Sequence, residues 1–175
     1  MIQITPVLSV RRAAMEDAPV IFETIQSERN FLKEWLPFVE KTKEIGDTEA
    51  FLKAGFAADE PIFMMIHDND FAGLIGFTNY DRDNHKAELG YWLKEKKQKQ
   101  GIVSLSVPVM LRYGFENMAL NRIQIKAAAE NLKSRRVAES FRFKLEGMER
   151  DGELLSSGLY TDLAVYSLLR RDMPD

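Results

Sequence analysis

The first third of the chain carries apolar residues at the spacing of helices, after one short strand pattern at 8–12. A helix is predicted to begin near 16–17, with Pro19 in its first turn, and its pattern breaks near Asn30. Asp47 stands just before the next helical run and is the predicted N-cap of that helix. We therefore expect one strand followed by helices in this region.

The middle of the chain changes to the two-residue alternation that is typical of strands. Three strands are predicted at 61–67, 71–80 and 86–93, and the Asp-Asn-Asp turn at 68–70 joins the first two. This part of the sequence therefore predicts an antiparallel meander.

Helices and strands alternate over the rest of the chain. Apolar residues recur at helical spacing from Ile102 to Phe115, and Pro108 is expected to kink that helix or to mark a tight first turn. The remaining predicted elements are a strand at 123–127, a helix at 131–141, and strands at 143–147 and 159–169. Together they predict a mixed, mostly antiparallel α/β sheet of six to seven strands, flanked by about four helices.

The composition narrows the class of protein. With 175 residues, 45% of them hydrophobic and 29% charged, residues 1–175 are expected to form a single domain with its own core. No apolar stretch approaches the roughly 18 residues of a membrane span, so we expect a soluble, cytoplasmic protein without a membrane partner. The net charge of −3 argues against a chain that coats nucleic acid. There is no cysteine and only two histidines, so no metal site is expected.

A lysine-rich loop at 94–104 joins the end of a predicted strand to the start of a helix. Backbone N–H groups at a helix start attract anions, and Gly101 lets the backbone approach a ligand closely. One interpretation is a phosphate or pyrophosphate site, with lysines near a further phosphate. The alternative is a solvated charged loop that caps the helix, as most charge runs are.

A second polar group lies about 30 residues further on. Asn131 has the position of a helix N-cap, and Ser134 lies on the first turn beside it. The two side chains either cap the helix or donate hydrogen bonds to a ligand between the two helix starts.

Four ordered segments carry a resemblance to a known family. They are ELGYW at 88–92, Gln98-x-x-Gly101, ALNRIQIKAAAENLKSRRVAESFRF at 119–143, and LEGMERDGELLSSGLYTDLAVYSLL at 145–169. In this order the chain resembles the GNAT acetyltransferases, and within them the branch similar to ribosomal-protein N-terminal acetyltransferases of the RimJ/RimL type. The resemblance implies a GNAT-like sheet with a central splay and acetyl-CoA as co-substrate.

The resemblance also implies which residues contact acetyl-CoA. The loop 98–104 would bind the pyrophosphate, the pantetheine arm would lie along the splayed strand, and the second polar group would line the thioester end. The implied contacts are Trp92, Leu93, Gln98, Lys99, Gln100, Gly101, Ile102, Val103, Ser104, Asn131 and Ser134.

The chain departs from the family pattern at several positions. Lys99 stands where the first loop glycine is usual, which costs on the order of 1 kcal/mol if that residue needs a positive φ. Val103 replaces a small residue, and Arg142 replaces the glycine before Phe143. Position 138 is alanine where many relatives have a tyrosine for the leaving thiolate, so Ser134 is the predicted replacement.

Acetyl transfer to an amine requires a polarised carbonyl, a stabilised thiolate and a base for the amine. Backbone N–H groups near Trp92 or Leu93 are expected to polarise the carbonyl, and Ser134 to serve the thiolate. The resemblance favours Glu153, acting through water, as the base. Glu88 is the alternative, because other branches of the family carry a base on that strand.

The acceptor is narrowed by proton chemistry. At pH 7 an α-amine is about 15% neutral and a lysine about 0.04% neutral, so one water-linked carboxylate suits an α-amine better. The favoured acceptor is the N-terminal α-amine of a ribosomal or other protein. A small-molecule amine such as an antibiotic or polyamine, and a non-catalytic acyl-CoA-binding module, are the alternatives. We expect no direct nucleic-acid partner, and a homodimer stays an open alternative.

Overall fold

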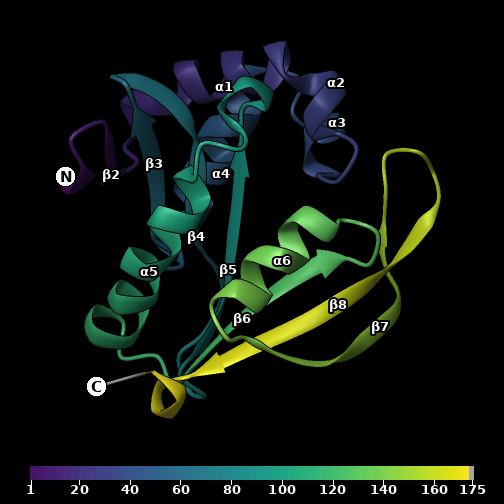
Figure 1. Cartoon of the computed structure of the whole chain (residues 1–175). Coiled ribbons are helices and arrows are strands. Elements are labelled where there is room, and N and C mark those ends of the chain that lie inside the picture. Colours follow the sequence, from purple (N-terminus) through teal and green to yellow (C-terminus); the bar gives the residue numbers. More distant parts are fainter. Residues whose placement is uncertain (174–175) are drawn as a thin grey trace.

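Eight strands form one mixed sheet in the order β1-β2-β3-β4-β5-β6-β8-β7 (Figure 1). The computed structural model describes residues 1–173. Every neighbouring pair is antiparallel except β5 and β6, which confirms the predicted mixed, mostly antiparallel sheet. The strands are β1 Ile2–Thr5, β2 Leu8–Arg12, β3 Ile62–His67, β4 Asp70–Asp81, β5 Lys86–Leu93, β6 Arg122–Ala128, β7 Lys144–Leu154 and β8 Tyr160–Leu169.

Helices cover both faces of this sheet. The α-helices are α1 Ala18–Ser27, α2 Arg29–Leu32, α3 Phe38–Lys41, α4 Ile45–Ala57, α5 Ile102–Arg112 and α6 Leu132–Ser140. Short helical turns lie at Met15–Asp17, Glu95–Lys97, Tyr113–Asn117 and Arg170–Asp172. No helix within residues 1–173 has both the length and the apolar character needed to cross a membrane.

Two apolar clusters lie on opposite faces of the sheet. Ile75 and Phe77 of β4 pack in the cluster that contains the buried residues of α5 and α6. Leu74 of the same strand packs in the second cluster, with Ile21 of α1 and Leu52 of α4. Because successive side chains of a strand point to opposite faces, α5 and α6 lie on one side of the sheet and α1 and α4 on the other.

Three details differ from the sequence-based expectations. Strand β1 is an additional edge strand, with no fully buried residue to mark it in the sequence. Glu44 is the N-cap of α4, and the predicted cap Asp47 is its third residue, whose carboxylate accepts the N–H groups of Lys43 and Glu44. Helix α5 begins at Ile102 and has Pro108 in its interior, so the alternative of a tight first turn at Pro108 is wrong.

The parallel pair β5 and β6 opens after a short paired stretch. Backbone partners run from Lys86 with Arg122 to Glu88 with Gln124, and β5 then continues to Leu93 beside β4 alone. Figure 1 shows the two strands adjacent at their starts and diverging toward their C-terminal ends. The predicted central splay is therefore confirmed.

Candidate functional site

A groove of about 710 Å³ lies in the splay between β5 and α6. Residues from α2, β5, the 94–101 loop, the start of α5 and the start of α6 line it. All residues that the sequence predicted to contact the cofactor line this groove, except Gln100. The side-chain amide of Gln100 instead donates to the backbone oxygen of Lys96, at 2.8 Å.

The loop at the start of α5 has the backbone geometry of an anion site. Gly101 is the N-cap residue, with a φ of +74°, and its carbonyl oxygen accepts the N–H of Leu105 at 2.8 Å. The N–H groups of residues 102–104 precede the first helical hydrogen bond, so they are available to a ligand in the groove. Lys99 has a φ of +62°, so it occupies the left-handed region that a glycine would adopt at lower cost.

Two of the four loop lysines are held by the protein itself. The ammonium group of Lys94 lies 3.1 Å from a carboxylate oxygen of Asp70, and that of Lys97 lies 3.5 Å from the other. Lys97 is buried and also donates to the carbonyl oxygen of His67 at 3.0 Å. Burial raises the pKa of Asp70, but the hydrogen bond and charge of Lys94 outweigh it and lower the pKa overall. These lysines therefore anchor the loop to the β3–β4 turn.

The start of α6 forms the opposite wall of the groove. Asn131 is the N-cap, and its side-chain oxygen accepts the N–H of Ser134 at 3.2 Å, which confirms the capping interpretation. A lysine on the first turn, Lys133, donates to the side-chain oxygen of Gln98 at 2.9 Å. This bond joins α6 to the loop across the groove.

Tyr91 is one of the groove residues that sequence reasoning missed. Its hydroxyl oxygen lies 3.1 Å from Ser134 Oγ, and it donates at 3.3 Å to the backbone oxygen of Ser134. The alternation of β5 gave a usable signal, since Tyr91 shares a face with Leu89 and Leu93 and not with Trp92. That face is the one that α6 covers.

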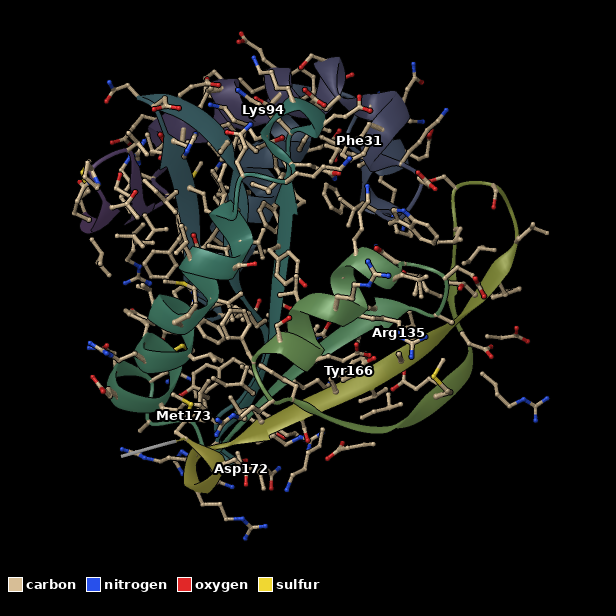
Figure 2. The ribbon with its side chains drawn as sticks, viewed as in Figure 1. Phe31, Lys94, Arg135, Tyr166, Asp172 and Met173 are labelled. Carbon is tan, nitrogen blue, oxygen red and sulfur yellow. The ribbon has the colours of Figure 1, made fainter. Side chains whose placement is uncertain are left out.

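A partly buried hydrogen-bond network fixes α6 on the sheet. The guanidinium of Arg135 donates to the hydroxyl oxygen of Tyr166 at 3.0 Å, and that hydroxyl donates to Glu139 at 2.7 Å. Arg135 also donates to the backbone oxygen of Ala129, at 3.0 Å. Figure 2 shows Arg135 and Tyr166 close together where α6 packs over β8. Because both partners of Tyr166 lie on α6, the network sets the position of Ser134.

The two predicted carboxylates lie outside this groove. Glu88 is on β5, and the side-chain amides of Asn79 and Gln124 lie 3.5 and 3.4 Å from one of its oxygens. Glu153 is the one residue of β7 that is not exposed. Burial raises the pKa of Glu153, and the negative charge of Glu88 acts in the same direction. The structure therefore brings the two candidates into electrostatic contact.

Comparisons with known proteins agree with this architecture. Residues 8–144 match the family described as acetyltransferase (GNAT) domain. The chain is 34% identical over 171 residues to the putative ribosomal N-acetyltransferase YdaF of Bacillus subtilis (strain 168), covering 94% of this chain and 92% of that protein. It is 28% identical over 173 residues to the ribosomal-protein-serine acetyltransferase of Escherichia coli (strain K12), covering 95% and 94%. The solved structure of RimL, a ribosomal L7/L12 alpha-N-protein acetyltransferase in complex with coenzyme A, has a TM-score of 0.91 and 24% identity, with 98% and 99% covered.

Proposed function

Because this chain belongs to the acetyltransferase (GNAT) domain family, we propose that it transfers an acetyl group from acetyl-CoA to the N-terminal α-amine of a protein or peptide. Two relatives that cover nearly the whole chain are named for acetylation of ribosomal proteins. The observation that carries the proposal is the groove, which joins a helix start with free N–H groups to the hydroxyl of Ser134.

The residues of the groove fit acetyl-CoA. The N–H groups at the start of α5 and the positive φ of Gly101 suit the pyrophosphate, because a bare backbone lets the anion approach the helix start closely. Beyond Glu88, strand β5 has no paired neighbour on the β6 side within the described residues. The N–H of Lys94 donates to Ala72 of β4, and Trp92 is paired with Leu74, so by alternation Leu93 turns its backbone groups to the open side, where they are free for the amide groups of pantetheine.

Ser134 is assigned to the leaving sulfur. Its backbone N–H already donates to the side chain of Asn131. The hydroxyl group is therefore the donor of this residue that is available to a ligand in the groove. A hydroxyl donor stabilises negative charge that develops on sulfur as the carbon–sulfur bond breaks. The effect is therefore made in the transition state rather than in substrate binding.

Glu153 is assigned as the base for the amine, acting through water, and Glu88 as its neighbour that raises the pKa. A carboxylate whose pKa is raised holds a proton better, which brings it closer to the pKa of an α-amine near 8. A lysine amine, at about 10.4, needs much stronger assistance to lose its proton. The pair therefore favours an α-amine acceptor.

The test combines cofactor binding with turnover. Coenzyme A at about 100 times its dissociation constant is expected to stabilise the fold by about 2.7 kcal/mol. Gly101→Glu is expected to abolish this shift in melting temperature, because it places a carboxylate beside the phosphates. Gly158→Glu is the matched control, since Gly158 also has a positive φ, of +83°, and a side chain there meets open space.

Turnover is measured as thiol release from acetyl-CoA with a panel of N-terminal peptides, polyamines and aminoglycosides. The proposal expects turnover with peptides that have a free α-amine, and loss of turnover when that amine is blocked. Turnover with the small amines alone would assign the acceptor to that class. Coenzyme A binding without turnover on any acceptor contradicts the proposal and favours a binding module.

A further inference from the structure

One side-chain contact spans the opened splay. Tyr91 lies three residues beyond Glu88, the last residue of β5 that pairs with β6. Its hydroxyl reaches the first turn of α6, 3.1 Å from Ser134 Oγ and 3.3 Å from the Ser134 backbone oxygen. Both residues line the groove. The contact therefore connects the two walls where their backbones have already separated.

The pair has two hydrogen-bonding arrangements. In the first, Ser134 donates to Tyr91, and Tyr91 donates to the backbone oxygen of Ser134. In the second, Tyr91 donates to Ser134 Oγ, and the serine proton stays free for the groove. A phenol is a more acidic donor than an alkyl alcohol, and a charge-bearing acceptor in the groove draws the serine proton toward itself. Both effects favour the second arrangement during the reaction.

We propose that Tyr91 is a positioning residue, whose hydroxyl donates to Ser134 Oγ and thereby directs the Ser134 proton toward the sulfur of the leaving coenzyme A. This inference rests on the proposed acetyl transfer. Two donors in series also polarise each other, so the serine becomes a stronger donor to the thiolate.

The burial of Tyr91 excludes it as the acid that protonates the thiolate. Burial raises the pKa of Tyr91 to about 12, against the opposing effect of the hydrogen bond with Ser134. An alkyl thiol has a pKa of about 8.5, so this phenol is the much weaker acid and full proton transfer from it to the thiolate is unfavourable. Tyr91 therefore keeps its proton throughout and acts only as a hydrogen-bond donor.

The proton balance closes without a net change at either hydroxyl. A carbon–nitrogen bond forms, the carbon–sulfur bond breaks, and the electron pair of that bond leaves with sulfur. The acceptor ammonium loses one proton, through water, to the carboxylate assigned as base, and the nitrogen loses a second proton to solvent after the carbon–nitrogen bond forms. The sulfur gains one proton from solvent once the product separates. Tyr91 and Ser134 end with the protons they held at the start.

The decisive experiment is a double-mutant cycle with Tyr91→Phe, Ser134→Ala and the double variant. Tyr91→Phe keeps the ring and removes the donor, so kcat is expected to fall about tenfold while KM for acetyl-CoA stays within about twofold. In the Ser134→Ala background the same change is expected to have almost no further effect, because Tyr91 acts through Ser134. Tyr113→Phe, whose half-buried ring packs edge-on against Phe63 outside the groove, is the control and keeps wild-type kcat.

A packing role for Tyr91 gives a different result. An equal loss from Tyr91→Phe in both backgrounds, or a loss confined to KM, overturns the inference. Wild-type kcat in Tyr91→Phe overturns it too and leaves the proposed function intact. Absence of turnover in the wild type on the whole acceptor panel overturns the proposed function and this inference together.

A second measurement covers the case in which Tyr91→Phe fails to fold. A ring-fluorinated tyrosine at position 91 keeps the shape and the hydroxyl but ionises at lower pH. Its turnover is expected to fall at the alkaline pH where the phenol ionises, because a phenolate cannot donate to Ser134. The wild type, with a Tyr91 pKa of about 12, shows no such fall below about pH 10. Identical alkaline profiles overturn the inference.

Discussion

The two sides of the splay are built differently. On the cofactor side, Ile102 and Ala138 are buried, the loop is tied to Asp70, and Asn131 caps α6. On the acceptor side, β7 is exposed along its length except at Glu153. The lesson is that the proposed cofactor side is fixed by packing, whereas the position of the proposed base depends on the local shape of one edge hairpin.

The position of Glu153 comes from an irregularity in that hairpin. The register of β7 against β8 shifts between the pair of Glu149 with Leu163 and the pair of Glu153 with Thr161. Extra residues on one strand form a bulge, which bends that strand and increases its twist. The N–H of Asp151 donates to the side chain of Asp162 at 2.9 Å and holds this bulge.

The largest expected effect is on the acceptor side. Glu153→Gln keeps the shape but removes the base, so turnover at pH 7 is expected to fall by about 10²–10⁴-fold. The loss should shrink as pH rises past about 8, where an α-amine is already neutral. The measurement is the pH–rate profile with a saturating peptide. Glu149→Gln, on the same strand but paired with Lys126, is the control.

The same variant sharpens the comparison through stability. The raised pKa of Glu153 means that its charged form is disfavoured in the folded state, so ionisation costs stability once pH exceeds the unfolded value of about 4.3. Glu153→Gln is therefore expected to raise the melting temperature slightly at pH 7 and not at pH 4. A lower melting temperature at pH 7 would assign Glu153 a structural role. A loss of turnover in Glu88→Gln that shrinks as pH rises would assign the role of base to Glu88 instead.

The next effect is on the cofactor side. Ser134→Ala is expected to lower kcat by about 10- to 100-fold, because a hydrogen bond to a charged group contributes about 1.5–3 kcal/mol. The dissociation constant for coenzyme A should change much less. Calorimetric titration and steady-state kinetics separate the two quantities. A collapse of coenzyme A affinity with unchanged kcat identifies Ser134 as a binding residue instead.

A smaller effect is expected at the loop anchor. Asp70→Asn removes the carboxylate shared by Lys94 and Lys97, and its half-exposed position limits the loss of stability to about 1 kcal/mol. Since the pKa of Asp70 is lowered, its contribution is present above an unfolded value of about 3.9 and is lost as pH falls below it. The melting temperatures of the wild type and of Asp70→Asn should therefore converge at acidic pH. Asp83→Asn, at an exposed turn position away from this anchor, is the control.

The smallest effect is a gain. Arg142 follows α6 with a φ of +61°, a conformation that glycine adopts more readily, so Arg142→Gly is expected to stabilise the fold by up to about 1 kcal/mol. Arg136→Gly, in the interior of the same helix, should lower stability by a similar amount. Thermal unfolding of both variants is the measurement, and the melting temperature is expected to rise in Arg142→Gly and to fall in Arg136→Gly.

The sequence predicted the cofactor side better than the acceptor side. Strand β5 has the predicted bounds 86–93, because its apolar residues at 87, 89, 91 and 93 recur at the two-residue spacing of a strand. The cap at Asn131 is a local interaction within one turn, so spacing alone predicts it. The helix start after Gly101 follows for the same reason.

Contacts between residues far apart in the sequence could not be predicted from local spacing. The contact of Tyr91 with Ser134 joins residues 43 positions apart, and the ion pair of Asp70 with Lys94 joins residues 24 positions apart. Neither pair has a spacing that a local pattern would reveal. The bulge before Glu153 depends on how β7 meets β8, so strand β7 is longer than the predicted 143–147.

The exposure of β7 also bears on how this protein behaves at high concentration. An edge strand offers unpaired N–H and C=O groups to other chains, which is a route to aggregation. Along β7, charged residues such as Lys144, Glu146 and Arg150 interrupt the apolar ones, and its irregular register bends the edge. The opposite edge, β1, has only four residues. Both ends of the sheet therefore resist the addition of a further strand from another molecule.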